Sequence, residues 1–108
     1  MENKDYGSYP SHLNGDRGRL IISSRSIRFE TSVGHRVVFV LNYDLIFKLE
    51  KVERNASKLT PGRDTGKDLR VCSKLDGDRE WLLTNMDDRD QAFSQIVGFS
   101  KTSWQVAW

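Results

Sequence analysis

Basic side chains in segments that read as turns and loops are the residues of this sequence best suited to bind a ligand. Six of them have no obvious acidic partner nearby: Arg17, Arg25, Arg36, Lys58, Arg63 and Lys67. A guanidinium holds a phosphate through two parallel hydrogen bonds, and an ammonium attracts it as a point charge. The pattern therefore indicates a partner that carries anionic groups such as phosphate.

The charges of the 108-residue chain are unevenly distributed, although its formal net charge is only +2. Residues 17–36 hold five arginines and one acid, residues 48–70 hold seven bases and four acids, and residues 76–90 hold two bases and six acids. A small domain with this bipolar pattern can attract an anionic partner with one side. The alternative is that these charges only keep the surface solvated.

Catalytic and metal-binding patterns are not found. His12 and His35 lie in turn-rich sequence without a nucleophile motif nearby, so two solvated histidines are expected. One cysteine and two widely spaced histidines are too few for a structural zinc site. Cys72 is expected to be a packed thiol, and residues 62–67 are one residue short of a phosphate-binding loop. We therefore predict a protein that is not an enzyme and uses no metal or cofactor.

Two short apolar runs on either side of residues 23–26 predict a β-hairpin. The positions expected to point inward are Leu20, Ile22, Ile27 and Phe29. If Leu20 pairs with Phe29 and Ile22 pairs with Ile27, the inner faces of both strands are apolar. On the outer face this register places Arg19 opposite Glu30, which predicts a cross-strand ion pair. Arg25 then lies at the tip of the hairpin without such a partner. Arg28 lies on the outer face, where the pattern does not distinguish a structural role from a binding role.

The rest of the chain predicts further short strands and one helix. Residues 9–13 suggest a short edge strand, because Pro10 cannot donate a backbone hydrogen bond. Residues 36–41 are apolar on both faces, as in a strand that is covered twice. Strands are also expected at 45–54, with a bulge near residues 50–51, and at 68–75 and 80–84. Apolar residues at helical spacing from Asp87 predict a helix that ends near Gly98.

Six or seven antiparallel strands followed by a C-terminal α-helix give an α+β fold with a small barrel or curved sheets. This order, with its motifs, resembles the GRAM domain of the pleckstrin-homology-like (PH-like) superfold. The motifs are Gly18-Arg-Leu-Ile-Ile-Ser followed by Ile27-Arg-Phe, Val40-Leu-Asn-Tyr-Asp-Leu-Ile with Lys51-Val, Trp81-Leu-Leu-Thr, and Asp88-Arg-Asp-Gln-Ala-Phe. The resemblance spans residues 9–98, while the long basic 55–67 loop and the C-terminal tail depart from it.

The resemblance implies a binding module of cytosolic, membrane-associated proteins. Family members bind phosphoinositides or other anionic lipids in some cases and proteins in others, without a shared phosphate-binding motif. It therefore implies anionic membrane lipids as partners and a cytoplasmic, peripheral membrane location. It assigns no individual site residue. Residues 1–8 are expected to be a polar lead-in, 9–99 the domain, and 100–108 a tail that carries two tryptophans.

The alternative function is a protein-interaction module of a membrane-associated protein. Its contacts would come from the doubly apolar strand at residues 37–41 and from Trp104 and Trp108, which on the lipid hypothesis instead anchor at the interface. Nucleic acid is disfavoured, because most aromatic residues fall on inward faces and the net charge is low. No stretch of 18 apolar residues exists, so we expect no transmembrane segment in this chain.

Overall fold

The computed structural model describes residues 4–53, 66–74 and 77–100, and the backbone of residues 105–107. The elements in chain order are β1 (Asp5–Leu13), β2 (Asp16–Ser23), β3 (Ser26–Thr31), β4 (Val37–Asn42), the 3-10 helix η1 (Tyr43–Leu45), β5 (Ile46–Glu53), β6 (Lys67–Ser73), β7 (Arg79–Thr84), α1 (Arg89–Ser100) and β8 (Gln105–Ala107). Seven antiparallel strands followed by a C-terminal helix confirm the α+β class. The strand order is β4-β3-β2-β1-β7-β6-β5-β8, and β8 runs parallel to β5.

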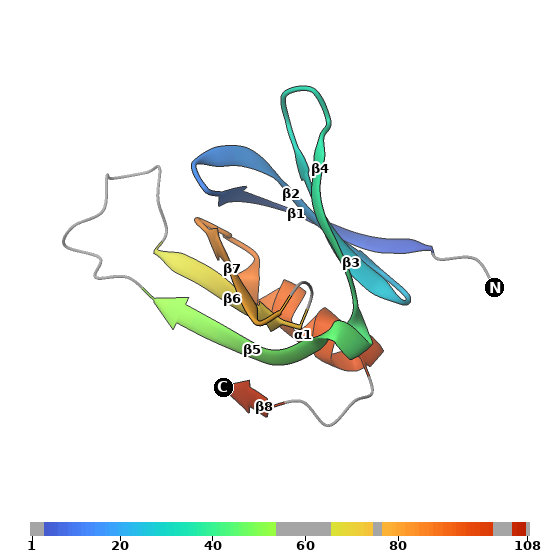
Figure 1. Cartoon of the computed structure of the whole chain (residues 1–108). Coiled ribbons are helices and arrows are strands. Elements are labelled where there is room, and N and C mark those ends of the chain that lie inside the picture. Colours follow the sequence, from blue (N-terminus) through green and yellow to red (C-terminus); the bar gives the residue numbers. More distant parts are fainter. Residues whose placement is uncertain (1–3, 54–65, 75–76, 101–104, 108) are drawn as a thin grey trace.

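The sheet bends into two halves that face each other. Strands β1 to β4 form one half and β5 to β7 the other, and they are joined where residues 12–13 of β1 pair with residues 83–84 of β7. Figure 1 shows the two halves crossing at a large angle, with α1 at the opening between them. The helix contacts strands of both halves. The arrangement is thus a pair of curved sheets closed by a helix, rather than a closed barrel.

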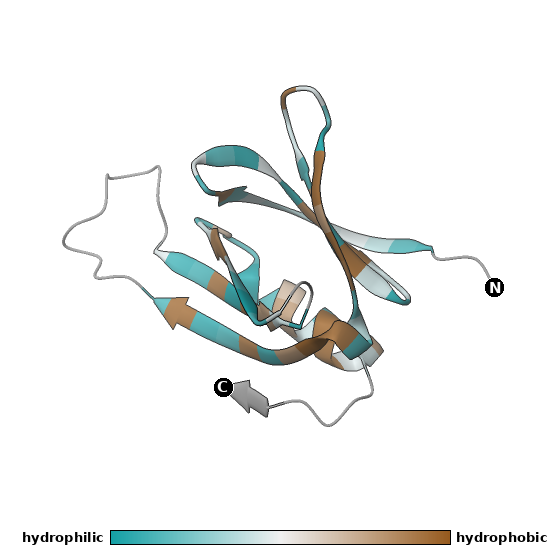
Figure 2. Cartoon of the chain, in the orientation of Figure 1, coloured by the Kyte–Doolittle hydropathy of each residue, from teal (hydrophilic) through white to brown (hydrophobic). Residues whose placement is uncertain are grey.

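The core fills the space between the two halves. Figure 2 shows hydrophobic segments where the strands cross and polar segments at most hairpins. The inward residues of the predicted 18–31 hairpin are all fully buried. Phe39 of β4 lies with its ring centroid 4.6 Å from that of Trp81 on β7, so this aromatic pair ties one half to the other.

The predicted register of the 18–31 hairpin is confirmed, but its predicted ion pair is wrong. Residues 19 and 30 are Cα partners, as expected. The Glu30 carboxylate nevertheless accepts a hydrogen bond from Arg28 Nε at 2.7 Å, and Arg19 donates to Ser8 Oγ at 3.2 Å. Arg28 also donates to both carboxylate oxygens of Asp5, at 2.8 and 2.9 Å, which lowers the pKa of Asp5 to about 2. Arg28 is therefore a structural residue that ties β3 to β1.

Strand β1 is longer than predicted. It begins at Asp5, so residues 5–8 of the expected lead-in pair with β2. It also lies between β2 and β7 in the strand order instead of at an edge. Pro10 is tolerated because β1 meets β7 only at its last two residues, which leaves one side of the strand unpaired at residue 10.

Two further expectations about strands need correction. Strand β4 is covered on one face only: Phe39 and Leu41 are buried, whereas Val37 and Val40 are 46% and 50% exposed. The bulge in β5 lies at Phe47, between the pairs formed by Ile46 and Lys48, and not near residues 50–51. A bulge at Phe47 turns Leu49 inward.

The helix is held against the second half by its first residue. Arg89 is 3% exposed in its side chain, donates to the Val52 carbonyl at 3.1 Å and forms an ion pair with Glu53 at 3.2 Å. The helix continues two residues beyond Gly98, where its end was predicted. No helix in the described part of the chain is long and apolar enough to span a bilayer.

Candidate functional site

The β1–β2 turn and the β3–β4 loop come together at one end of the first half. Asn14 and Gly15 both have positive φ angles, of 53° and 85°, so a tight turn with the twist of the flanking strands joins β1 to β2. The β3–β4 loop extends beyond this turn, and Figure 1 places it at the top of the molecule. We call residues 16–17 and 31–36 the Val33 end, after the residue at its tip.

Hydrogen bonds fix the shape of the β3–β4 loop. The Thr31 hydroxyl donates to the Val33 carbonyl at 2.8 Å and accepts from the backbone N–H of Arg36 at 3.0 Å. The backbone N–H of Ser32 donates to the Arg17 carbonyl at 2.9 Å, which ties the loop to β2. Gly34 and His35 have positive φ angles and allow the chain to reverse. The loop is therefore braced at its base and presents its tip in a defined position.

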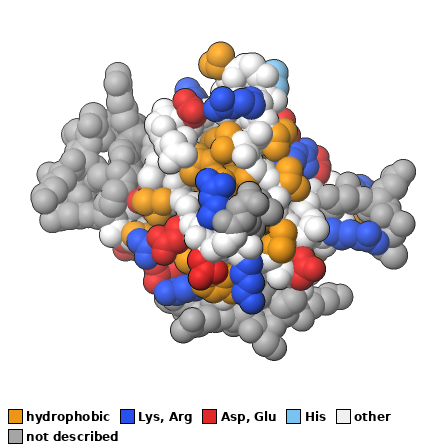
Figure 3. Space-filling model, in the orientation of Figure 1, with side chains coloured by type: hydrophobic (Ala, Val, Ile, Leu, Met, Phe, Trp, Pro, Cys, Tyr) orange, Lys and Arg blue, Asp and Glu red, His pale blue; other side chains and the backbone are white. Residues whose placement is uncertain are grey.

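The tip presents an apolar side chain to solvent. Val33 is 90% exposed, the largest exposure among the large hydrophobic residues of the described chain. Figure 3 shows a hydrophobic side chain projecting at the top of the molecule, with Lys and Arg side chains close below it. A single exposed valine is common on protein surfaces, but at the tip of a braced loop Val33 is accessible to an external apolar contact.

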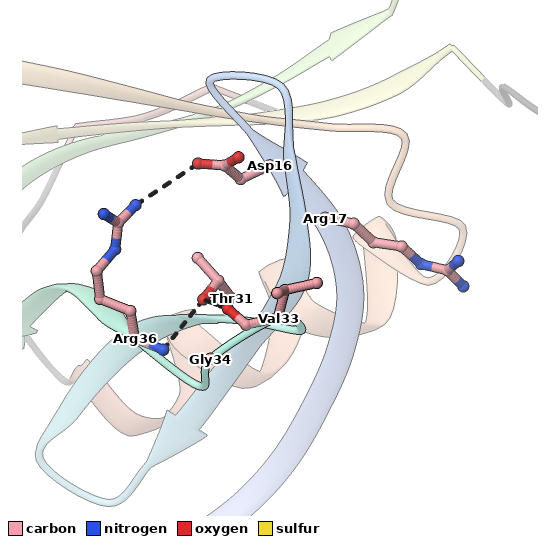
Figure 4. Close-up of a pocket in the computed structure, with 6 residues that line it drawn as sticks. All are labelled: Asp16, Arg17, Thr31, Val33, Gly34 and Arg36. Atoms are coloured by element: carbon pink, nitrogen blue, oxygen red, sulfur yellow. Dashed lines mark hydrogen bonds and ion pairs between the residues drawn. The ribbon is translucent and has the colours of Figure 1, made fainter.

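Beneath the tip lies a hollow of about 430 Å³, lined by Asp16, Arg17, Thr31, Val33, Gly34 and Arg36. Figure 4 shows Arg36 pointing across it toward Asp16, at 3.6 Å, while the guanidinium of Arg17 points away from Arg36. Both partners of this ion pair are more than half exposed, so it contributes little and is readily exchanged. Because the two arginines diverge, they suit several anionic groups on a surface better than one enclosed phosphate.

The other predicted site residues lie elsewhere. Arg25 lies in the turn that follows the far end of β2, and the stretch of β2 from Arg17 to Ser23 alone spans about 20 Å. Lys67 begins β6 in the second half, where its carbonyl accepts from the Met86 N–H at 2.9 Å. Four predicted contact residues lie outside the described residues: Lys58, Arg63, Trp104 and Trp108. Of the six predicted cations, the structure brings together Arg17 and Arg36.

The residues considered for catalysis are placed as follows. His12 lies in β1, within the strand predicted at 9–13, and is half-buried instead of solvated, whereas His35 is exposed in the β3–β4 loop as expected. Cys72 is 3% exposed, and burial raises the pKa of its thiol, so the nucleophilic thiolate is disfavoured. Within residues 4–53, 66–74 and 77–100, no three metal-ligating side chains gather at one point.

Two residues of the Val33 end were missed in the sequence. Val33 stands alone among polar residues in Thr31-Ser-Val-Gly-His35, and an isolated apolar residue at a turn is the signal that could have identified it. Asp16 belongs to the turn-forming sequence Asn14-Gly-Asp16, and its proximity to Arg36 depends on the contact between two hairpins, which the sequence does not specify.

The sequence matches no protein-family model and no curated protein. The fold, however, is similar to the crystal structure of the C-terminal domain of an unknown protein from Leishmania infantum. The TM-score is 0.71 with 20% sequence identity, and the match covers 93% of this chain and 86% of that one. At this identity the likeness shows the fold alone, and it supports the arrangement of strands and helix described above.

Proposed function

We propose that this chain is a non-catalytic membrane-recruitment module of the GRAM type, within the PH-like superfold, that docks on anionic lipid headgroups at the cytoplasmic surface of a membrane. The strand order, the two crossed halves and the C-terminal helix support the assignment to this superfold. The observation that carries the functional proposal is Val33, 90% exposed on a braced loop beside Arg17 and Arg36. Phosphoinositides and phosphatidylserine both present the negative charge that these arginines require.

Each part of this end has a separate role in docking. Arg17 and Arg36 face the phosphate groups of the leaflet, where each base contributes about 1 kcal/mol. Val33 enters the interface, and a fully buried valine gains about 1.5–3 kcal/mol. The braced loop reduces the entropy lost on binding. Because two arginines and one valine supply the contact, binding is weak and sensitive to salt.

Flotation with liposomes tests this function. We expect the chain to float with vesicles rich in phosphatidylserine or phosphoinositide at low salt, to be released as the salt concentration rises, and to remain in solution with neutral phosphatidylcholine vesicles. Equal binding to neutral vesicles would contradict a role for the arginines. The lipid function itself is wrong if the chain stays in solution with both kinds of anionic vesicle at low salt.

A further inference from the structure

The ion pair between Asp16 and Arg36 joins two hairpins at the Val33 end, and the backbone holds both residues in place. Asp16 begins β2 and pairs with Leu13 across the β1–β2 turn. The backbone N–H of Thr31 donates to the Arg36 carbonyl at 2.9 Å, and the Arg36 N–H donates to Thr31 Oγ at 3.0 Å. The carboxylate and the guanidinium therefore stay near each other even when the ion pair itself opens.

The fold does not depend on the Asp16 carboxylate. Within the described part of the chain, Arg36 is the one side chain with which it forms an ion pair or hydrogen bond, and an ion pair this exposed contributes little stability. The hydrogen bond from the Ser32 N–H to the Arg17 carbonyl already ties the β3–β4 loop to β2. The main effect of the carboxylate is therefore on the charge of this end.

Asp16 halves the positive charge of the Val33 end, which otherwise carries the two arginines Arg17 and Arg36. Its carboxylate competes with a lipid phosphate for the guanidinium of Arg36, because both groups accept the same N–H hydrogen bonds. A phosphate that displaces the carboxylate still has this negative charge beside it and is repelled by it. Asp16 therefore opposes docking both before and after Arg36 is released.

We propose that Asp16 is an autoinhibitory residue, whose carboxylate holds Arg36 and restricts docking to surfaces that are dense in anionic headgroups. This inference rests on the proposed lipid function and concerns the regulation of the same site. The guanidinium of Arg17 points away from Arg36 and is available for the first encounter (Figure 4). The attraction of the surface grows with its content of anionic lipid, so a dense surface overcomes the opposition of Asp16 and a sparse one does not.

Neutralising Asp16 tests the inference, and D16N does so while keeping the size of the side chain. With vesicles of phosphatidylserine in phosphatidylcholine, we expect D16N to bind about tenfold more tightly than the unmodified chain. About fivefold comes from one negative charge removed beside the surface and about twofold from release of an exposed ion pair. D16E keeps the charge and should bind as weakly as the unmodified chain.

D44N is the matched control, because it also removes one exposed carboxylate. Asp44 belongs to η1 and follows Tyr43, whose backbone N–H donates to the Arg25 carbonyl beyond the far end of β2. The change in net charge is the same, but the distance from the Val33 end screens its effect. We therefore expect D44N to tighten binding by less than about twofold.

The R36Q background separates the masking of Arg36 from simple repulsion. Adding D16N to R36Q should tighten binding by about fivefold only, because no ion pair is left to release. Equal gains in the two backgrounds, or D16N binding no tighter than D44N while the unmodified chain floats, would overturn this inference and leave the proposed function intact. If the unmodified chain and D16N both stay in solution with phosphatidylserine-rich and phosphoinositide-rich vesicles at low salt, the proposed function is wrong and this inference is wrong with it.

Discussion

Reversing Arg17 and Arg36 together to glutamate is expected to weaken binding to anionic vesicles by about 1,000-fold. Each reversal removes about 1 kcal/mol of attraction and adds a similar repulsion, so two reversals cost about 4 kcal/mol, at 1.4 kcal/mol per tenfold change. Both side chains are exposed, so the fold should be unaffected. The measurement is liposome flotation over a range of lipid concentrations, with circular dichroism to verify folding.

The matched control reverses two exposed bases far from the Val33 end. Arg25 follows the end of β2 that is remote from Arg17, and Lys74 directly follows β6. The backbone N–H of Lys74 donates to the Leu45 carbonyl of η1 at 2.8 Å. R25E/K74E changes the net charge by the same amount, so it should lose only the smaller, long-range part of the attraction. If this control lost binding while R17E/R36E kept it, the docking surface would be the opposite end of the molecule.

Replacing Gly18 by alanine is expected to lower the free energy of unfolding by about 3 kcal/mol, at the upper end of overpacking effects. A Cβ atom at this position would overlap the carbonyl oxygen of Glu30 and lie 2.7 Å from Cζ of Phe29. The first neighbour is backbone and the second is a fully buried ring, so neither can move away easily. Urea denaturation followed by tryptophan fluorescence measures the change.

Gly98 provides the opposite case for comparison. It lies in α1, is exposed, and has no atom within 4 Å of the position that a Cβ would take. G98A should therefore raise the free energy of unfolding by about 0.5–1 kcal/mol, because alanine favours helix. A G18A variant as stable as the unmodified chain would show that β2 and β3 are packed less closely than the structure indicates.

The sequence was most informative where a regular alternation of apolar and polar residues determined which side chains of an element are buried and which are exposed. The 18–31 hairpin alternates so regularly that one register alone buries all four apolar residues, and this register is observed. The helix is predicted because the spacing of apolar residues changes after Asp87 from the alternation of a strand to the spacing of a helix. The class and the approximate strand positions follow from such local patterns.

Contacts between distant segments could not be predicted in the same way. Glu30 lies near two arginines, Arg19 and Arg28, and pairs with Arg28. Arg28 is also bound by Asp5, which belongs to a part of β1 whose polar sequence did not predict a strand. Likewise, residues 37–41 are apolar on both faces, although β4 is an edge strand whose outer face is not covered within this chain. The Val33 end depends on the meeting of two hairpins, which residue types alone do not determine.

The central claim is that Val33 enters the lipid surface, and a fluorophore at this position measures that directly. Cys72 is buried with a raised thiol pKa, so a cysteine at residue 33 can be labelled selectively with an environment-sensitive dye. With anionic vesicles, we predict a blue-shifted and brighter emission from the label on V33C. The same dye on D44C, at an exposed position of η1 next to Tyr43, whose backbone N–H donates to the Arg25 carbonyl at the far end of β2, should stay unchanged. If the label at position 33 keeps the emission that it shows in aqueous solution while the protein is bound to vesicles, the account is wrong.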